Sequence, residues 1–232
     1  MVNLMNIPYV VNGWNWGNAE KKQLAAYLPD NLILGDGITF QPKKENVGAW
    51  WREGNKAVAV VRNYSSGMIR SVDTFLYGYF KFIAKLPDFR GAWPAIWLFP
   101  TKAGWVSEID IMEQFRKDDW WSRYRNQIGI YKVLESGKRW SCCRQARQWQ
   151  PCDKGTMTYE LIWTPDTIAV IVNGSCRFYS ETPINTPMNL IMNLAIGDWD
   201  VQDDKLDPFH ILLAEHEPIT LKLCVSKKQQ NF

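Results

Sequence analysis

The chain has 232 residues, 46% of them hydrophobic, and a formal net charge of +3. This length is enough for one large hydrophobic core, so we expect a single domain, residues 1–232. The small net charge gives no reason to expect nucleic acid as a partner, and no apolar run approaches the ~20 residues of a membrane-spanning helix.

The first residues, MVNLMNIPYVVNGW, lack a basic stretch followed by a long apolar one, so they do not predict a secretory signal peptide. Farther along, GDG at 35–37 predicts a hairpin turn between two short strands. The intervening AEKKQLAAYL, residues 19–28, has the propensity of a helix, and Pro29 ends the run. A helix and an extended segment are both alternatives here.

Most of the remaining chain has the chemistry of strands. AVAVVR (57–62) is β-branched, and SVDTFLYGYFKFIAKLP (71–87) alternates from Phe75 to Lys85, which predicts strand throughout. TYELIWTPDTIAVIVNGSCRFYS (158–180) predicts strands joined by turns at TPD and NGS. We expect MNLIMNLAIGDWD (188–200) to be a buried strand that ends at Trp199, and ITLKLCVSK (219–227) to be a last strand that closes the fold.

Three carboxylates lie on one predicted strand, SEIDIMEQF (107–115), which follows GAWPAIWLFP (91–100). Side chains alternate along a strand, so Glu108 and Asp110 share a face, and Glu113 should point the other way. One extra residue, a β-bulge at Ile111 or Met112, would return Glu113 to the face of the other two acids. Ile109, and one of Ile111 and Met112, would then face the core.

The spacing of the two glutamates indicates a particular chemistry. The Cα atoms of Glu108 and Glu113 would lie ~13 Å apart, and two leaning side chains could bring their carboxyl groups to roughly 5–6 Å. That separation is typical of retaining glycosidases, in which one carboxylate attacks the anomeric carbon and the other protonates the leaving oxygen. A solvent-facing acidic strand is the alternative. The flanking Trp93, Trp97 and Trp105 favour the glycosidase, because indole rings are flat apolar surfaces for sugars.

SEIDIMEQF resembles the bulged active-site signature of glycoside hydrolase family 16, which includes laminarinases, agarases and carrageenases. Three more segments resemble successive strands of that family in the expected order, LYGYFKFIAKLPDFRGAWPAIWLFP, TYELIWTPDTIAVIVNG and PMNLIMNLAIGDW. The resemblance implies an all-β, concanavalin A-like jelly-roll sandwich of two curved antiparallel sheets, with the carboxylates on a concave face. It also implies that Glu108 is the nucleophile, Asp110 its hydrogen-bonding helper and Glu113 the acid/base.

The resemblance also implies residues for substrate binding. Asn193 and Trp199 correspond to an asparagine and a tryptophan that lie in the cleft of family members. YSSGMIRS (64–71) resembles a segment that borders the cleft, which makes Arg70 a candidate for sugar contact, with an ordinary surface arginine as the alternative. An extended segment on the active-site side is implied over residues 19–28.

The chain departs from the family pattern at two places. Many relatives carry a histidine on the strand after the motif, but that region here is NQIGIYKV (126–133), so we expect Tyr131 or a water to take its place. The terminal strand often carries an aspartate that binds structural calcium, whereas Lys222 stands in ITLKLCVSK. We therefore expect no cofactor and no metal site, with structural calcium as the alternative.

Residues 116–154 differ in character, with ten Lys or Arg against four acids and four interleaved tryptophans. We expect a long loop or insertion, whose arginines, Arg123 and Arg125 among them, could recognise an anionic or sulfated sugar. A solvated basic face and a nucleic-acid contact are the alternatives. We expect the five cysteines to be mainly free thiols, although Cys142 or Cys143 could bridge to Cys152.

We predict a retaining endo-acting glycosidase that cleaves internal β-linkages of a polysaccharide, first of all a β-1,3- or mixed β-1,3-1,4-glucan. A β-galactan of agar, porphyran or carrageenan type is the alternative substrate, and a transglycosylase would use the same covalent intermediate. The alternative from another class is a non-catalytic sugar-binding jelly roll. We expect a monomer whose partner is the polysaccharide. The family implies an extracellular location, but without a predicted signal peptide the sequence assigns none.

Overall fold

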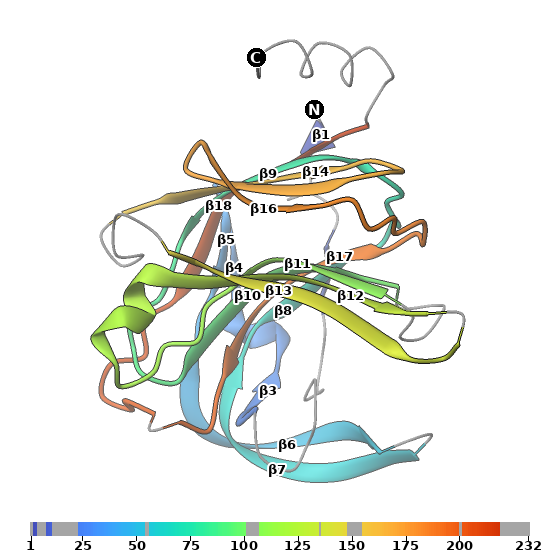
Figure 1. Ribbon diagram of the computed structural model, residues 1–232. Helices are drawn as coiled ribbons and strands as arrows, with labels where there is room; N and C mark the ends of the chain where they lie inside the picture. Colours follow the sequence, from blue (N-terminus) through green and yellow to red (C-terminus); the bar gives the residue numbers. More distant parts are fainter. Residues whose placement is uncertain are drawn as a thin grey trace.

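The protein is built from strands, as the sequence predicts (Figure 1). The computed structural model describes residues 2–3, 8–10, 23–53, 56–100, 107–134, 136–147, 155–199 and 201–218. Within these ranges the helical elements are two short 3₁₀ helices, η2 (Pro29–Asn31) and η3 (Trp120–Tyr124), and no helix is long and apolar enough to cross a membrane. The strands are β1 (Val2–Asn3), β2 (Pro8–Val10), β3 (Ala25–Tyr27), β4 (Leu32–Leu34), β5 (Ile38–Phe40), β6 (Lys43–Glu53), β7 (Lys56–Ser66), β8 (Met68–Ser71), β9 (Gly78–Lys85), β10 (Ala92–Phe99), β11 (Ser107–Glu113), β12 (Arg125–Val133), β13 (Arg139–Arg147), β14 (Met157–Trp163), β15 (Ile168–Val172), β16 (Ser175–Ser180), β17 (Asn189–Ile196) and β18 (Phe209–Glu217).

Two antiparallel sheets form the layers of a jelly-roll sandwich, which confirms the predicted fold. The first sheet runs β16-β15-β14-β9-β18-β5-β4, with β1 also paired to β18, and the second runs β13-β12-β11-β10-β17-β8-β2. A third sheet, β3-β7-β6, was not predicted, and its β3–β7 pair is parallel. In Figure 1 the long β6–β7 hairpin lies beneath the second sheet, on the side away from the first.

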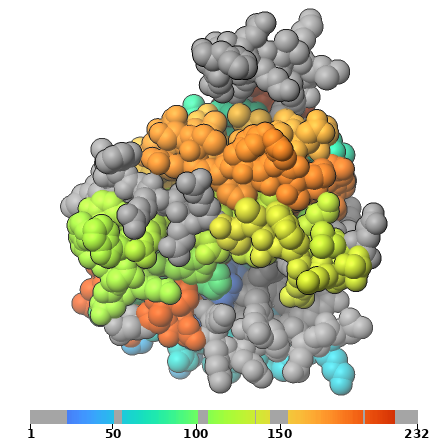
Figure 2. All heavy atoms as spheres, in the orientation of Figure 1, coloured from blue at the N-terminus to red at the C-terminus, as the bar shows by residue number. Residues whose placement is uncertain are grey.

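The hydrophobic core fills the space between the two layers, which pack closely in Figure 2. Strands β9 and β14 alternate along their length, burying every second side chain and leaving the others partly exposed, as half-buried antiparallel strands do. The second sheet faces them with Ile109, Ile111 and Met112 of β11 and Ile128 and Ile130 of β12. The buried residues of β9 and β14 include Phe80, Phe82, Ala84, Tyr159, Leu161 and Trp163.

Several local predictions are confirmed. Residues 35–37 turn between β4 and β5, TPD turns between β14 and β15, and NGS turns between β15 and β16. The described part of residues 19–28 is extended, because β3 pairs with β7 instead of forming a helix. The expected terminal strand at 219–227, and with it Lys222, lies outside the described residues.

Two predicted element bounds are wrong, and one strand was not predicted. The strand expected from Phe75 begins only at Gly78, because Tyr77 has φ +66°, in the left-handed region that interrupts a strand. The strand expected to end at Trp199 ends at Ile196. The sequence also gave no signal for β18, which pairs with both β9 and β5 inside the first sheet.

The basic stretch 116–154 is not a long loop. It contains η3 and then β12 and β13, which extend the second sheet beyond β11. Cys142 and Cys143 on β13 are free thiols, as is Cys176, so the proposed bridge from Cys142 or Cys143 is wrong. Cys152 and Cys224 lie outside the described residues.

Candidate active site

The predicted bulge is present in β11. Opposite this strand, Asp110 pairs with Gly129 of β12 and Glu113 pairs with Gln127, so three steps along β11 face two along β12. On the other side of β11, strand β10 shows the same irregularity: Ile96 pairs with Met112, and the next residue, Trp97, pairs with Asp110. Ile111 is therefore the inserted residue. This insertion brings Glu113 to the face of Asp110.

The core side of β11 differs from the prediction in one residue. The sequence predicted that only one of Ile111 and Met112 would face the core. Both are fully buried there, together with Ile109. A bulge places two consecutive residues opposite a single partner, which allows both apolar side chains to be accommodated on the same side.

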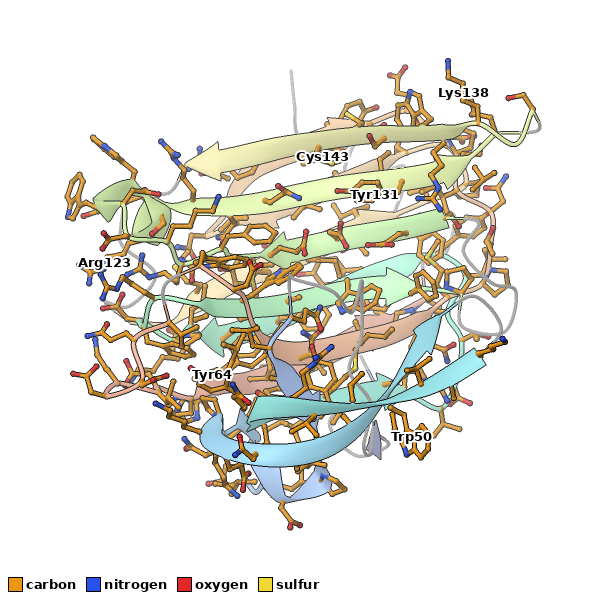
Figure 3. All side chains as sticks on the ribbon, turned by 90° about the horizontal axis from the view of Figure 1, so that it is seen from below. Trp50, Tyr64, Arg123, Tyr131, Lys138 and Cys143 are labelled. Carbon is orange, nitrogen blue, oxygen red and sulfur yellow. The ribbon has the colours of Figure 1, made fainter. Side chains whose placement is uncertain are left out.

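The strand register aligns the site residues in two rows across the second sheet, on the face turned away from the sandwich core. Figure 3 looks onto this face, with Tyr131 and Cys143 on adjacent strands. One row is Gln127–Glu113–Ala95–Asn193–Met68, and the next is Gly129–Asp110–Trp97–Ile191–Arg70.

All three carboxylates line two adjoining cavities on this face. The first also contains Trp97, Asn193 and the β3 residue Tyr27. The second opens toward Phe115, Lys117 and Trp199. Because both cavities include Glu108, Asp110 and Glu113, the carboxylates lie in the middle of one continuous cleft.

Glu113 is held by a hydrogen bond to each of its oxygens. Trp93 Nε1 donates to Oε1 at 2.9 Å, and Gln127 Nε2 donates to Oε2 at 3.2 Å. Burial nevertheless raises the pKa of Glu113 to about 7, with the charge of Glu108 acting in the same direction and the two donors opposing it. At neutral pH this carboxyl can therefore both release and accept a proton.

Asp110 is the most buried of the three acids, with 2% of its surface exposed. Burial raises its pKa well above the ordinary value, and the charges of Glu113 and Glu108 and a hydrogen bond with Glu108 add to this. Gly129 is its neighbour on β12, where a Cβ would be in ordinary contact with Asp110 Oδ2 at 3.5 Å but would crowd Cys143 Sγ at 3.0 Å. Asp110 thus keeps a proton more readily than an ordinary aspartate and can donate it in a hydrogen bond to Glu108.

The predicted aromatic residues have two different roles in the cleft. Trp93 lies against Phe115 and Trp199, with ring centroids 4.9 and 5.8 Å away. Trp199 is oriented by its Nε1, which donates to the Arg116 carbonyl at 2.6 Å, and it packs directly on Gly197, where a Cβ would come within 2.2 Å of the ring. These three rings form an aromatic wall next to Glu113.

Trp97 and Asn193 form the floor of the first cavity. Trp97 is only 7% exposed, and its Nε1 donates to Asn193 Oδ1 at 2.9 Å. Asn193 in turn donates to the Tyr27 hydroxyl at 3.2 Å. Arg70 lies on the same face, two strands from Trp97, but lines neither cavity. Trp105 lies outside the described residues.

Tyr131, the residue expected in place of the missing histidine, lines the same cavity as Glu113. It pairs with Glu108, and its hydroxyl accepts a hydrogen bond from Cys143 Sγ at 3.0 Å. Burial, the bond with Cys143 and the charge of Asp110 raise the Tyr131 pKa, so its phenol stays protonated. The β12 residue that donates to Glu113 is Gln127, which sequence reasoning missed.

Other residues of the cleft were also missed. Phe115 is the last residue of the motif and Lys117 lies two residues beyond it, so both could have been found from their proximity to the carboxylates. Tyr27 reaches the site through the parallel β3–β7 pair, for which the sequence offers no local signal. Among the described residues, no group of three or more His, Cys, Asp or Glu is arranged to hold a metal ion.

Comparison with known proteins agrees with the geometry. The family described as glycosyl hydrolases family 16 matches residues 38–211. Endo-1,3-1,4-beta-glycanase EglC of Rhizobium meliloti (strain 1021) is 32% identical over 139 residues, which are 58% of this chain and 28% of EglC. A beta-glucanase of Rhodothermus marinus is 29% identical over 214 residues, 82% of this chain and 68% of that enzyme.

Solved structures share the fold. The crystal structure of LamAcat from Zobellia galactanivorans superposes with a TM-score of 0.73 at 22% identity, covering 90% of this chain and 89% of that one. This likeness concerns the fold alone. The chain spans less than a third of the length of EglC, the first of the curated relatives.

Proposed function

Because the chain belongs to glycosyl hydrolase family 16, we propose that it is an endo-acting glycosidase that works by double displacement with net retention. Glu108 is the nucleophile, Glu113 the acid/base and Asp110 the residue that holds Glu108. The observation that carries this proposal is the bulge at Ile111, which brings three carboxylates into one cleft and leaves Glu113 with a pKa of about 7.

In the first step, a carboxylate oxygen of Glu108 attacks the anomeric carbon, and the bond from that carbon to the glycosidic oxygen breaks. Glu113 gives its proton to the leaving oxygen. Its raised pKa supplies this proton near neutral pH, where an ordinary glutamate would be almost fully ionised. The product is a glycosyl ester on Glu108.

In the second step, Glu113 is a carboxylate and takes a proton from water, whose oxygen attacks the same carbon and releases Glu108. Esterification removes the charge of Glu108, which was one cause of the raised Glu113 pKa. The pKa of Glu113 is therefore lower in the intermediate, so the carboxyl is ionised when it has to accept a proton from water. The Trp93 and Gln127 donors stabilise the carboxylate form during this step.

We propose a β-1,3- or mixed β-1,3-1,4-glucan as the polysaccharide substrate. The support is the similarity to an endo-1,3-1,4-beta-glycanase and to a beta-glucanase. The aromatic wall of Trp93, Phe115 and Trp199 is suited to a glucan chain, because pyranose rings stack on flat apolar surfaces.

The test is to incubate the protein with laminarin, lichenan, agarose, porphyran and κ-carrageenan and to measure new reducing ends. Glu108→Gln and Glu113→Gln should each nearly abolish hydrolysis, and Asp110→Asn should reduce it less. Glu181→Gln, at the surface beside Tyr179, is the matched control and should behave as wild type. Hydrolysis by Glu108→Gln at the wild-type rate would remove the proposed nucleophile, and binding without product on any glycan would favour a non-catalytic module.

A further inference from the structure

The cleft continues beyond the carboxylates into a third cavity of about 260 Å³. This cavity shares Phe115, Lys117 and Gln127 with the cavity that contains Glu108, Asp110 and Glu113, so a chain bound at the carboxylates can extend into it. Its other lining residues are Asp119, Ser122 and Arg125.

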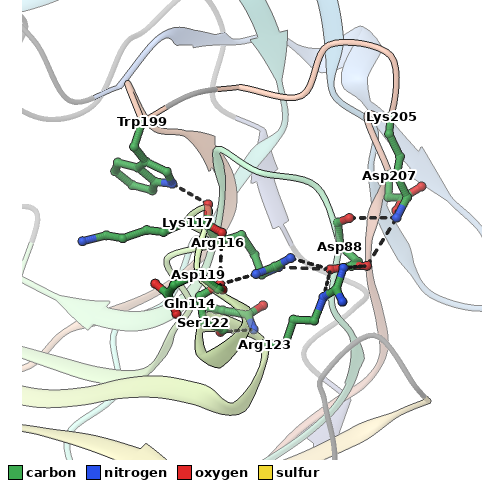
Figure 4. A network of polar contacts seen from close by, with 10 residues as sticks. All are labelled: Asp88, Gln114, Arg116, Lys117, Asp119, Ser122, Arg123, Trp199, Lys205 and Asp207. Atoms are coloured by element: carbon green, nitrogen blue, oxygen red, sulfur yellow. Dashed lines mark hydrogen bonds and ion pairs between the residues drawn. The ribbon is translucent and has the colours of Figure 1, made fainter.

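The wall of this third cavity is held in place by buried polar contacts (Figure 4). Arg116, only 4% exposed, donates to Asp88 through Nε at 3.1 Å and Nη2 at 2.7 Å, and also to Ser122. Arg123 donates to both oxygens of Asp88, at 2.9 and 3.0 Å. These contacts fix the segment that carries Lys117 and η3.

These contacts divide the cations of the basic segment into those that are bound by Asp88 and those that have no acidic partner among the described residues. The guanidinium groups of Arg116 and Arg123 both donate to Asp88, which also pairs with Lys205, so their donors are already engaged within the protein. Lys117 and Arg125 have no ion pair within the described part of the chain, and both line the third cavity. Figure 4 shows Lys117 extending away from Asp88 and alongside Trp199.

Positively charged side chains are therefore concentrated at the end of the cleft that forms the third cavity. Two cations and one acid, Asp119, line the third cavity. The second cavity shares Lys117 with it but is lined by Asp198 and the three carboxylates, and the first contains the three carboxylates and, among the described residues, no cation. A neutral sugar uses hydroxyl hydrogen bonds and gains little from two cations. A guanidinium offers a planar fork of donors that matches a sulfate or carboxylate, and an ammonium adds a point charge.

We propose that the third cavity is a subsite for a sugar unit that carries an acidic group, and that Lys117 and Arg125 bind this group. The inference rests on the proposed glycosidase activity and refines its substrate, because the glycan that is cut would carry an acidic unit in the third cavity, which an unsubstituted glucan lacks. A sulfate ester and a uronic-acid carboxylate share the required chemistry. Recognition is therefore expected to lie in Lys117 and Arg125, not in Arg123.

The experiment compares kcat/KM for sulfated galactan chains with that for the same chains after chemical desulfation, and likewise for uronate-bearing glucans before and after carboxyl reduction. The wild-type enzyme should prefer one of the acidic forms. Lys117→Gln and Arg125→Gln should each reduce that preference roughly tenfold, the effect of losing a charged hydrogen bond. Added salt should reduce the wild-type preference as well. The acidic form that is preferred identifies the group.

Lys138→Gln is the matched control, because Lys138 lies at the far end of the β12–β13 hairpin, at the opposite side of the sheet from Arg123 (Figure 3). It removes the same charge and should leave the preference unchanged. An equal loss in Lys138→Gln, or a wild-type enzyme that shows no preference for either acidic form, would overturn the proposal while leaving the glycosidase intact.

A second readout separates this inference from the proposed function. Binding of a sulfated and a uronate-bearing oligosaccharide to the Glu108→Gln protein is measured by calorimetry, where no cleavage can occur. Binding that is weakened by Lys117→Gln and Arg125→Gln supports the subsite even if no glycan is hydrolysed. Binding that is indifferent to both substitutions overturns the subsite even if hydrolysis is observed.

Discussion

Replacing Glu113 by glutamine should stabilise the folded protein relative to the wild type, by an amount that grows as the pH rises from 4.5 to about 7. The carboxyl has an ordinary pKa of 4.5 in the unfolded chain and about 7 in the fold, so the folded protein binds this proton more tightly. The stability of the wild type is therefore complete below pH 4.5, falls as the pH rises and levels off above about 7. Glu113→Gln has no proton to lose and avoids this fall.

The magnitude follows from the difference between the two pKa values. At about 1.4 kcal/mol for each pKa unit, a difference of about 2.5 corresponds to ~3 kcal/mol above pH 7. The contacts of the site should survive, because Trp93 Nε1 can still donate to the amide oxygen and Gln127 can rotate its own amide to accept from the new NH₂ group. Loss of the Glu113 charge also favours an ionised Asp110, which acts in the same direction.

The assay is urea unfolding followed by tryptophan fluorescence at pH values between 4.5 and 8. The free energy of unfolding of Glu113→Gln should equal that of the wild type at pH 4.5 and exceed it by ~3 kcal/mol at pH 8. The exposed control Glu181→Gln should not reproduce the gain of ~3 kcal/mol at pH 8. A Glu113→Gln protein whose advantage is absent at pH 8, or is the same at every pH, would refute the cause assigned to the raised pKa.

Three further predictions concern catalysis and the support of the cleft. The alkaline limb of the pH profile of kcat/KM should lie near pH 7. Trp93→Phe should move this limb up by about one pH unit, since the Glu113 carboxylate loses a charged hydrogen bond. A limb that does not move would contradict the assignment of Glu113 as the acid. Proton NMR early in hydrolysis should show a retained anomeric configuration, and an inverted product rules out double displacement. Asp88→Asn should lower the free energy of unfolding by ~3–5 kcal/mol, because it leaves the buried Arg116 unpaired; a loss below 1 kcal/mol would show that Arg116 finds another partner.

The catalytic strand was predictable because its information is local. Alternation along β11 fixes which side chains share a face, and the need to bring Glu113 to Asp110 predicts the bulge. The turns GDG, TPD and NGS are local in the same way, since turn residues specify their own backbone conformation. No long-range contact has to be known for either prediction.

The errors concern contacts between segments that are distant in the sequence. The arginines of the basic stretch were considered both for sugar recognition and as a solvated face, yet Arg116 and Arg123 are engaged by Asp88, which lies 28 and 35 residues earlier. Composition shows the excess of cations but not which anion they meet. The parallel pairing of β3 with β7, which brings Tyr27 to Asn193, depends in the same way on the assembled fold.

The missed role of Gln127 shows how a single insertion sets two properties of the site. Without the bulge, the register of Asp110 with Gly129 would continue and place Glu113 opposite Asn126, whose side chain is buried and donates to Tyr159 in the core. The bulge moves the partner by one residue, to Gln127 on the cleft face. The insertion that turns Glu113 toward the cleft therefore also supplies a donor to its Oε2, and this bond opposes the effect of burial on the pKa. The sequence prediction applied the bulge to β11 alone and did not carry the shift in register across to β12. It therefore identified Glu113 but not Gln127, the residue on β12 that lowers its pKa.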